Sequence, residues 1–278
     1  MNLLPADLQM GAVTLRVANV DAMLKFYTEG VGLEVIATSG NGYVLGHGDN
    51  QVLFLEHSPH LAQAGSHEAG LFHTAFLFET EAELAYVVAT VASKYPGTFT
   101  GSADHLVSKA FYFDDLEGNG VELYWDRPRS QWQIDGTTIK MDTLPLDPNA
   151  YLNEHLKDLG STTAGIGHVH LSVGDLGQAK DFYVDTLGFD LTFNYANTAM
   201  FVSAGGYHHH MAMNIWRSRG AGVRQQTLGL GDMEIKLGSS EAVTAVLDRA
   251  KFNNRAVKDN GDSVIINDPW GNQVTVRA

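Results

Sequence analysis

Three side chains that can bind a metal ion lie on separate segments with the pattern of short β-strands. His73 falls within GLFHTAFLF, Glu122 within NGVELYW and His168 within GIGHVHLSV. Two imidazoles and one carboxylate are the ligand set of a non-haem Fe(II) centre, which leaves coordination positions open for a substrate and O2. The chain has 12 His and 32 acidic residues, so such a trio also arises by chance and needs support from the surrounding pattern.

An internal repeat gives that support. With Gly11 laid on Gly167, an offset of 156, five further matches follow: Leu15 on Leu171, Val17 on Val173, Phe26 on Phe182, Tyr27 on Tyr183 and Gly32 on Gly188. The Asp-x-x-Gly-Asn turn that begins at Asp115 recurs at Asp268. Self-similarity at a fixed offset indicates repeated structural modules. The chain therefore reads as two copies of a two-module unit.

Each module is predicted to contain a strand, a helix and three further strands. Alternating apolar residues open each module, apolar residues three or four apart follow, and short strand patterns close it. The expected fold class is α+β, with the order βαβββ four times. The expected modules span about 9–57, 70–128, 165–216 and 226–278, in halves 1–128 and 165–278 joined by a connecting segment, 129–164. A short helix is predicted at 149–159 within that segment.

Composition excludes several classes of function. A net charge of −14 argues against nucleic acid, which is bound by basic surfaces. No apolar stretch approaches the roughly 20 residues that span a bilayer, and the first residues lack the basic start and apolar core of a signal peptide. We therefore expect a cytoplasmic protein without a membrane partner. The chain has no Cys, so a transition metal must be bound by His, Asp or Glu.

Paired βαβββ modules, with His on a first strand and Glu on a last strand, resemble the vicinal oxygen chelate superfamily of glyoxalases, bleomycin resistance proteins and extradiol dioxygenases. Segments 104–133, 171–189 and 203–210 are most similar to its bacterial catechol-2,3-dioxygenase-like branch. The resemblance implies a Fe(II)-dependent extradiol dioxygenase of aromatic compound catabolism. Its expected partners are a small aromatic diol and O2, and a homo-oligomer is compatible with it. Mn(II) or another divalent metal is an alternative, because these ligands bind several divalent ions.

The positions of the ligands predict how the modules pair. The corresponding positions in modules 1 and 4 hold other residues: Ala12 for His168, Asp232 for His73 and Thr275 for Glu122. For the three ligands to share one ion, module 2 must pair with module 3, which leaves module 1 to pair with module 4. We therefore predict two open β-barrels, a metal-bearing 2+3 and a non-catalytic 1+4. The alternative pairing, 1+2 and 3+4, would separate His168 from the other two ligands.

Four further residues are candidates for catalysis by resemblance. A His where the last strand of module 3 begins acts as an acid/base in extradiol enzymes, and the spacing favours His210, with His209 second. Tyr112 resembles the Tyr that hydrogen-bonds the bound catecholate, and His105 would line the same pocket. The other interpretation is a polar surface tract for the histidines and a Tyr at the edge of the core. His170 is either a support for the site or a core residue.

Two other functions remain open. A glyoxalase-type lyase or isomerase of the same superfamily uses a fourth ligand, a carboxylate on the last strand of the partner module. That strand here reads HHMAMNIW, with Asn214 and no acidic residue, which favours an open site. The second alternative is a non-enzymatic protein that binds or sequesters small molecules. Such a protein does not need three metal ligands, so the complete set argues against this alternative.

Overall fold

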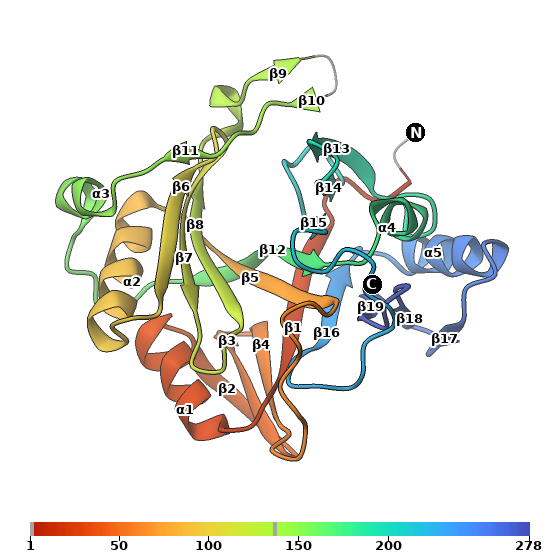
Figure 1. The fold of residues 1–278 in the computed structure, drawn as a ribbon, viewed down its shortest axis with the longest axis horizontal. Coiled ribbons are helices and arrows are strands. Elements are labelled where there is room, and N and C mark those ends of the chain that lie inside the picture. The colour runs from red at the N-terminus through yellow and green to blue at the C-terminus, as the bar shows by residue number, and fades with distance from the viewer. Residues whose placement is uncertain (1–2, 136–137) are drawn as a thin grey trace. The chain divides into compact units, whose positions relative to one another are not determined.

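The computed structural model describes residues 3–135 and 138–278 (Figure 1). The predicted order βαβββ is confirmed in all four modules. Module 1 consists of β1 (Gln9–Val17), α1 (Val20–Lys25) with a π-helical turn (Phe26–Gly30), β2 (Glu34–Ser39), β3 (Gly42–His47) and β4 (Asn50–His57). Module 2 consists of β5 (Gly70–Phe78), α2 (Glu81–Lys94), β6 (Phe99–Asp104), β7 (Ser108–Asp114) and β8 (Gly120–Asp126).

The second half of the chain repeats this order. Module 3 consists of β12 (Ala164–Ser172), α4 (Leu176–Tyr183), β13 (Asp190–Tyr195), β14 (Ala199–Ser203) and β15 (Met211–Asn214). Module 4 consists of β16 (Gly229–Lys236), α5 (Ser240–Phe252), β17 (Val257–Asp259), β18 (Ser263–Asn267) and β19 (Gln273–Arg277). The connecting segment holds a 3-10 turn (Arg129–Gln131), β9 (Ile134–Asp135), β10 (Thr138–Ile139), β11 (Leu144–Pro145) and α3 (Pro148–His155).

The strands form two large curled sheets, as expected for the α+β class. Modules 1 and 4 supply an eight-stranded sheet in the order β17-β18-β19-β16-β1-β4-β3-β2. Modules 2 and 3, with β11 of the connecting segment, form a nine-stranded sheet in the order β11-β6-β7-β8-β5-β12-β15-β14-β13. The predicted pairing of modules, 1 with 4 and 2 with 3, is therefore confirmed by the strand order.

The chain divides into two compact units. One comprises Arg16–His60 and His73–Gly167, and the other comprises Met1–Leu15, Leu61–Phe72 and His168–Ala278. The predicted boundaries of the two halves of the chain, 1–128 and 165–278, stay a prediction. In the part of the chain that the structure describes, no helix is long and apolar enough to cross a membrane.

The same polar link stabilises each unit. The Tyr27 hydroxyl donates to Asp115 Oδ2 at 2.8 Å, and the Tyr183 hydroxyl donates to Asp268 Oδ2 at 2.9 Å. Asp115 Oδ1 also accepts the backbone N–H of Asn119 at 2.9 Å. Each carboxylate thus joins the first helical segment of one module to the last turn of the next. This link explains why the Asp-x-x-Gly-Asn motif and its Tyr recur together in the sequence.

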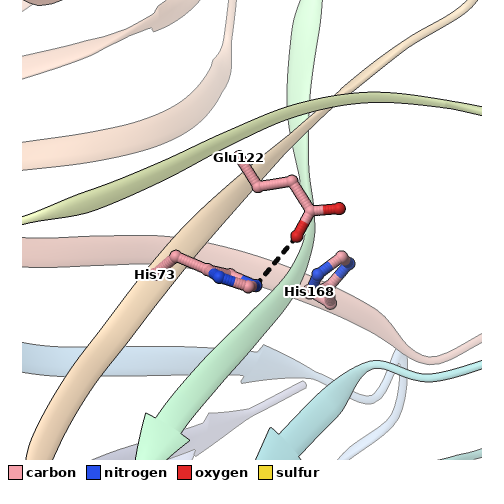
Figure 2. Close-up of side chains that lie close together, drawn as sticks. All are labelled: His73, Glu122 and His168. Atoms are coloured by element: carbon pink, nitrogen blue, oxygen red, sulfur yellow. Dashed lines mark ion pairs between the residues drawn. The ribbon is translucent and has the colours of Figure 1, made fainter. Parts of the chain in front are cut away.

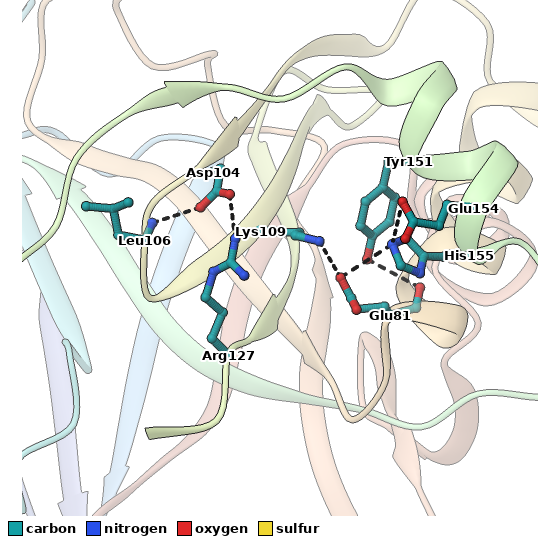
Figure 3. A network of polar contacts seen from close by, with 8 residues as sticks. All are labelled: Glu81, Asp104, Leu106, Lys109, Arg127, Tyr151, Glu154 and His155. Atoms are coloured by element: carbon teal, nitrogen blue, oxygen red, sulfur yellow. Dashed lines mark hydrogen bonds and ion pairs between the residues drawn. The ribbon is translucent and has the colours of Figure 1, made fainter. Parts of the chain in front are cut away.

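The predicted helix in the connecting segment is α3, which ends at His155, earlier than expected. Its N-terminus is favoured by Pro148 and by Asp147, whose side chain accepts from two N–H groups of the first turn. The Tyr151 hydroxyl donates to the main-chain carbonyl of Glu81 on α2 at 3.3 Å. Figure 3 shows this contact beside the ion pair of Glu81 with Lys109, 2.5 Å. The segment is therefore attached to module 2.

Candidate metal centre

His73 and Glu122 lie on neighbouring parallel strands, β5 and β8. The register pairs Ala75 with Glu122, two residues beyond His73 and therefore on the same face of the sheet. His73 Nε2 lies 2.8 Å from Glu122 Oε2, and their side chains are only 7% and 4% exposed. A carboxylate buried to this degree is costly unless it is paired or bound to a metal. The buried pair is therefore a candidate metal-binding site rather than a surface ion pair.

His168 on β12 completes the group. The ligand atoms of His73, Glu122 and His168 all lie within 4.8 Å of one another, and all three residues are buried. Figure 2 shows the two imidazoles and the carboxylate turned toward one another from three strands. Bonds from such donors to a metal ion are about 2.0–2.2 Å long, so ligand atoms that share an ion lie roughly 3–4 Å apart. The donor set fits one divalent ion after small side-chain rotations.

Tyr112 lies directly opposite Glu122 in the β7–β8 pair. Burial raises the pKa of Tyr112 well above its ordinary value, and the Glu122 carboxylate raises it further. The phenol therefore stays protonated and can donate a hydrogen bond. Its oxygen lies 2.7 Å from Nε2 of His105, so two of the predicted catalytic residues are in direct contact.

The orientation of His105 is determined by the connecting segment. His105 Nδ1 lies 2.8 Å from the main-chain carbonyl of Asp142. A carbonyl only accepts, so Nδ1 carries the proton of the neutral ring. The Tyr112 hydroxyl lies within hydrogen-bond distance of both His105 Nε2 and the Glu122 carboxylate. Sequence reasoning missed Asp142, because a main-chain carbonyl leaves no signal in residue type.

The three histidines of the 208–210 tract are all buried and occupy different positions. The His209 ring packs on His168, with centroids 4.1 Å apart. His210 Nδ1 accepts from the backbone N–H of Ala204 at 3.3 Å and lies 3.0 Å from Ser203 Oγ. His208 Nδ1 lies 2.7 Å from His209 Nδ1. The tract is therefore part of a packed histidine cluster at His168 rather than a solvated surface tract.

His210 and His168 share a face of the sheet. β12 and β15 are parallel and pair Val169 with Met211, so the preceding residues, His168 and His210, are neighbours across the strands. Since a backbone N–H only donates, the Ala204 contact requires His210 Nδ1 to be unprotonated. The neutral His210 ring consequently carries its proton on Nε2.

The equivalent positions in the eight-stranded sheet contain no such trio. Thr275 Oγ1 donates to Asp232 Oδ2 at 2.8 Å. Burial raises the pKa of Asp232 to about 6, more than its hydrogen bonds lower it. The Ala12 N–H donates to Glu234 Oε2 at 3.3 Å, a contact that sequence reasoning missed. A hydroxyl–carboxyl pair and an alanine replace the two imidazoles and the carboxylate.

Comparison with known proteins places the chain in a family. The profile of the Glyoxalase/Bleomycin resistance protein/Dioxygenase superfamily matches residues 9–123 and 165–276, and the chain belongs to this superfamily. It is 36% identical to the catechol-2,3-dioxygenase of Bacillus subtilis (strain 168) over 273 residues, 95% of this chain and 94% of that protein.

Solved structures agree on the fold. Glyoxalase I from Zea mays superposes with a TM-score of 0.57 at 16% identity, over 98% of this chain and 92% of that one. A putative dioxygenase from Bacillus subtilis superposes with a TM-score of 0.63 at 12% identity, over 96% and 84%. At these identities the likeness shows the shared fold alone.

Proposed function

We propose that the protein is an extradiol dioxygenase that opens the ring of a catechol-type substrate with O2, using a divalent metal, Fe(II) in the first place. The observation that carries the proposal is the buried trio of His73, Glu122 and His168. Two His and one carboxylate are typical of non-haem Fe(II) oxygenases. The relative at 36% identity over nearly the whole chain, a catechol-2,3-dioxygenase, supports the same reaction.

His73, His168 and Glu122 would hold the ion, and Fe(II) would supply redox chemistry and open positions for the diol and O2. Glu122 would balance part of the charge of the ion, and its carboxylate is held 2.8 Å from His73 Nε2 in a buried position. The ring of His209, packed on His168, limits how the ligand imidazole can rotate. Contacts of this kind around a metal typically tune the affinity of the site.

Tyr112 and His210 are the groups that we assign to proton handling. Tyr112 remains a protonated donor beside Glu122, which suits it to stabilise negative charge on a substrate oxygen. His105 contacts the same hydroxyl through Nε2 and is itself positioned by the Asp142 carbonyl, so it helps to orient the Tyr112 hydroxyl. His210 carries its proton on Nε2, and its ring is oriented through Nδ1, as required of a general acid/base.

A glyoxalase-type activity is the alternative, and Asn214 argues against it. A fourth ligand would be a carboxylate on β15, where Asn214 is the polar residue at the strand's end. Its amide is already engaged: Nδ2 lies 3.1 Å from His170 Nε2, and Oδ1 accepts from the Trp216 N–H at 3.2 Å. With three protein ligands the ion retains more open positions, which suits a diol and O2.

The proposal is tested by anaerobic loading with Fe(II), followed by a panel of catechols and addition of O2. We expect one O2 consumed per catechol and a ring-opened product that absorbs in the visible range. Glu122→Gln should lose both signals, whereas Asp232→Asn, at an equivalent position in the other sheet, should keep them. Full metal occupancy without O2 uptake on any catechol would refute the proposed reaction, and a parallel assay with a hemithioacetal would then test the glyoxalase-type alternative.

A further inference from the structure

A series of aromatic contacts leads away from His168 along β12, β14 and β15. His209 packs on His168, and the Phe201 ring lies 5.0 Å from that of His209. The Phe201 ring in turn lies 5.9 Å from that of His170. Centroid separations of about 4.5–7 Å are those of favourable aromatic pairs. The candidate metal ligand is thus connected to a second imidazole through ring contacts.

His170 is the centre of this second group. Its ring lies 4.9 Å from that of Phe72 and 5.5 Å from that of Trp216, and the latter two rings are 5.2 Å apart. We call Phe72, His170, Phe201 and Trp216 the aromatic wall. Phe72 and Phe201 are half-buried, and Trp216 is 47% exposed. The wall therefore presents aromatic surface that the fold does not cover completely.

Asn214 holds His170 in place. Because the Trp216 N–H donates to Asn214 Oδ1, the amide turns its NH2 group toward His170 and donates to Nε2. His170 and Asn214 are only 3% and 1% exposed. A buried imidazole fixed in this way is part of a rigid surface, and a rigid surface loses little entropy when it binds a ligand.

The distance from the metal ligands suits a ring substituent. His168 and His170 are alternate residues of one strand, so their side chains lie on the same face about 6.6 Å apart along it. A catechol held by its two oxygens at the His168 end would extend one ring length toward His170. None of the four side chains of the wall is an acid, a Lys or an Arg, so an ionised substituent would find no counter-charge there.

We propose that the aromatic wall determines specificity by accepting a neutral aromatic substituent of the diol and disfavouring an anionic one. This inference rests on the proposed function, and it adds the substrate class. Substituents that stack on Trp216 and Phe201 would gain affinity, whereas an unsubstituted catechol would leave the wall unused. The wall contributes to selection among diols and takes no part in the chemical step.

The test is calorimetric binding under anaerobic conditions to the Fe(II)-loaded protein. The ligands are catechol, phenyl-substituted catechol and 3,4-dihydroxybenzoate. For the native protein we expect phenylcatechol to bind at least about tenfold more tightly than catechol, and the carboxylated diol to bind more weakly than either. Trp216→Ala and Phe201→Ala should each lower the phenylcatechol preference roughly two- to tenfold, the typical worth of one aromatic pair. In Trp216→Ala, which leaves the contacts of His168 and His209 intact, the Kd for catechol should remain within about twofold.

Phe252→Ala is the matched control, because Phe252 is an aromatic residue of the same unit, 86% exposed and outside the wall. It should keep the native preference. The inference is overturned if the native protein binds both diols equally, or if both wall variants retain the full preference. Turnover is measured separately: selective binding without turnover refutes the proposed reaction alone, and turnover without selectivity refutes the aromatic wall alone.

Discussion

The imidazole of His209 packs on that of His168, with ring centroids 4.1 Å apart and an angle of 51° between the planes. The next residue, His210, instead has its Nδ1 engaged by Ala204 and Ser203. The two adjacent histidines thus contact different strands: His209 contacts His168 of β12, and His210 contacts Ser203 of β14. His209 packs on the ring of a candidate ligand, whereas the ring of His210 is oriented by Ser203 and Ala204. This difference gives separate expectations for the two residues.

For His209→Ala we expect weaker metal binding. The substitution removes the ring that restricts rotation of His168, and loss of such supporting contacts typically costs about 10–100-fold in metal affinity. Competition titrations with a metal-binding dye measure this effect directly. If metal affinity is unchanged while turnover disappears, His209 is the acid/base and the roles of the two histidines are exchanged.

For His210→Ala we expect full metal occupancy with slow turnover. A positioned acid/base contributes about 10²–10⁴-fold in rate, so kcat should fall by that range while substrate still binds. Single-turnover kinetics on metal-loaded protein measures it. His210→Asn is the companion variant, because its amide oxygen can take the place of Nδ1 and retain the Ala204 contact. It therefore separates the loss of proton transfer from loss of the local fold. Wild-type kcat in both variants would remove His210 from the mechanism.

Much of the fold could be predicted because the internal repeat shows where each module begins and ends. Matching Tyr27 with Tyr183 and Asp115 with Asp268 aligns the modules. The presence of candidate ligands only in modules 2 and 3 predicts the strand order seen. Each of these residues has a distinctive type at a repeated position. The alternation of apolar residues predicted the individual strands, since side chains alternate between the two faces of a sheet.

The contacts that orient the site could not be predicted in the same way. His105 is held by the carbonyl of Asp142, in a segment without periodicity, and the link from Ala12 to Glu234 also uses a main-chain atom. Every residue has an N–H or a carbonyl to offer, apart from the missing N–H of Pro. Only the folded backbone shows which of these groups meets a given side chain.

The ligand assignment predicts that His73→Ala, His168→Ala and Glu122→Ala each abolish stoichiometric metal binding while the fold survives. Each removes one donor from a set of three, and the remaining two donors hold a divalent ion far less tightly. Metal content after desalting, with circular dichroism as a check on folding, measures this. Asp232→Ala is the control, because it occupies the position of His73 in module 4. Any of the three variants with unchanged metal content would lose its place as a ligand.

Tyr112→Phe tests a single hydroxyl. The ring is retained, so packing and metal binding should persist, while the hydrogen bond to His105 is lost. We expect kcat to fall by roughly 10²-fold, the lower end for a positioned proton donor. Tyr183→Phe is the matched control, since the Tyr183 hydroxyl donates to Asp268. This substitution should lower stability and leave kcat unchanged. Loss of metal in Tyr112→Phe would instead identify Tyr112 as a structural support for Glu122.

Asp115 predicts how stability depends on pH. Burial raises the pKa of Asp115 from 3.8 to about 6, against the lowering effect of hydrogen bonds from Asn119, Tyr27 and Glu117. The unfolded chain releases this proton near pH 4, so between about pH 4 and 6 the folded state binds more protons. The contribution of Asp115 to stability is therefore fully present well below pH 3.8 and is lost as the pH rises through about 6.

The comparison of the native protein with Asp115→Asn isolates this effect, because the other carboxyl groups, including Asp268, titrate in both. The free energy of unfolding is measured in urea at pH 4, 5, 6 and 7. We expect the difference, native minus variant, to fall by roughly 2.4 kcal/mol between pH 4 and 7, from 1.36 kcal/mol per pKa unit, because the unfolded carboxyl is already partly ionised at pH 4. The variant loses acceptors for several donors, so its absolute stability is lower at every pH, and only the trend of the difference is diagnostic. A difference that stays constant or grows with pH would show that Asp115 is ionised in the folded protein, with its hydrogen bonds outweighing the cost of burial.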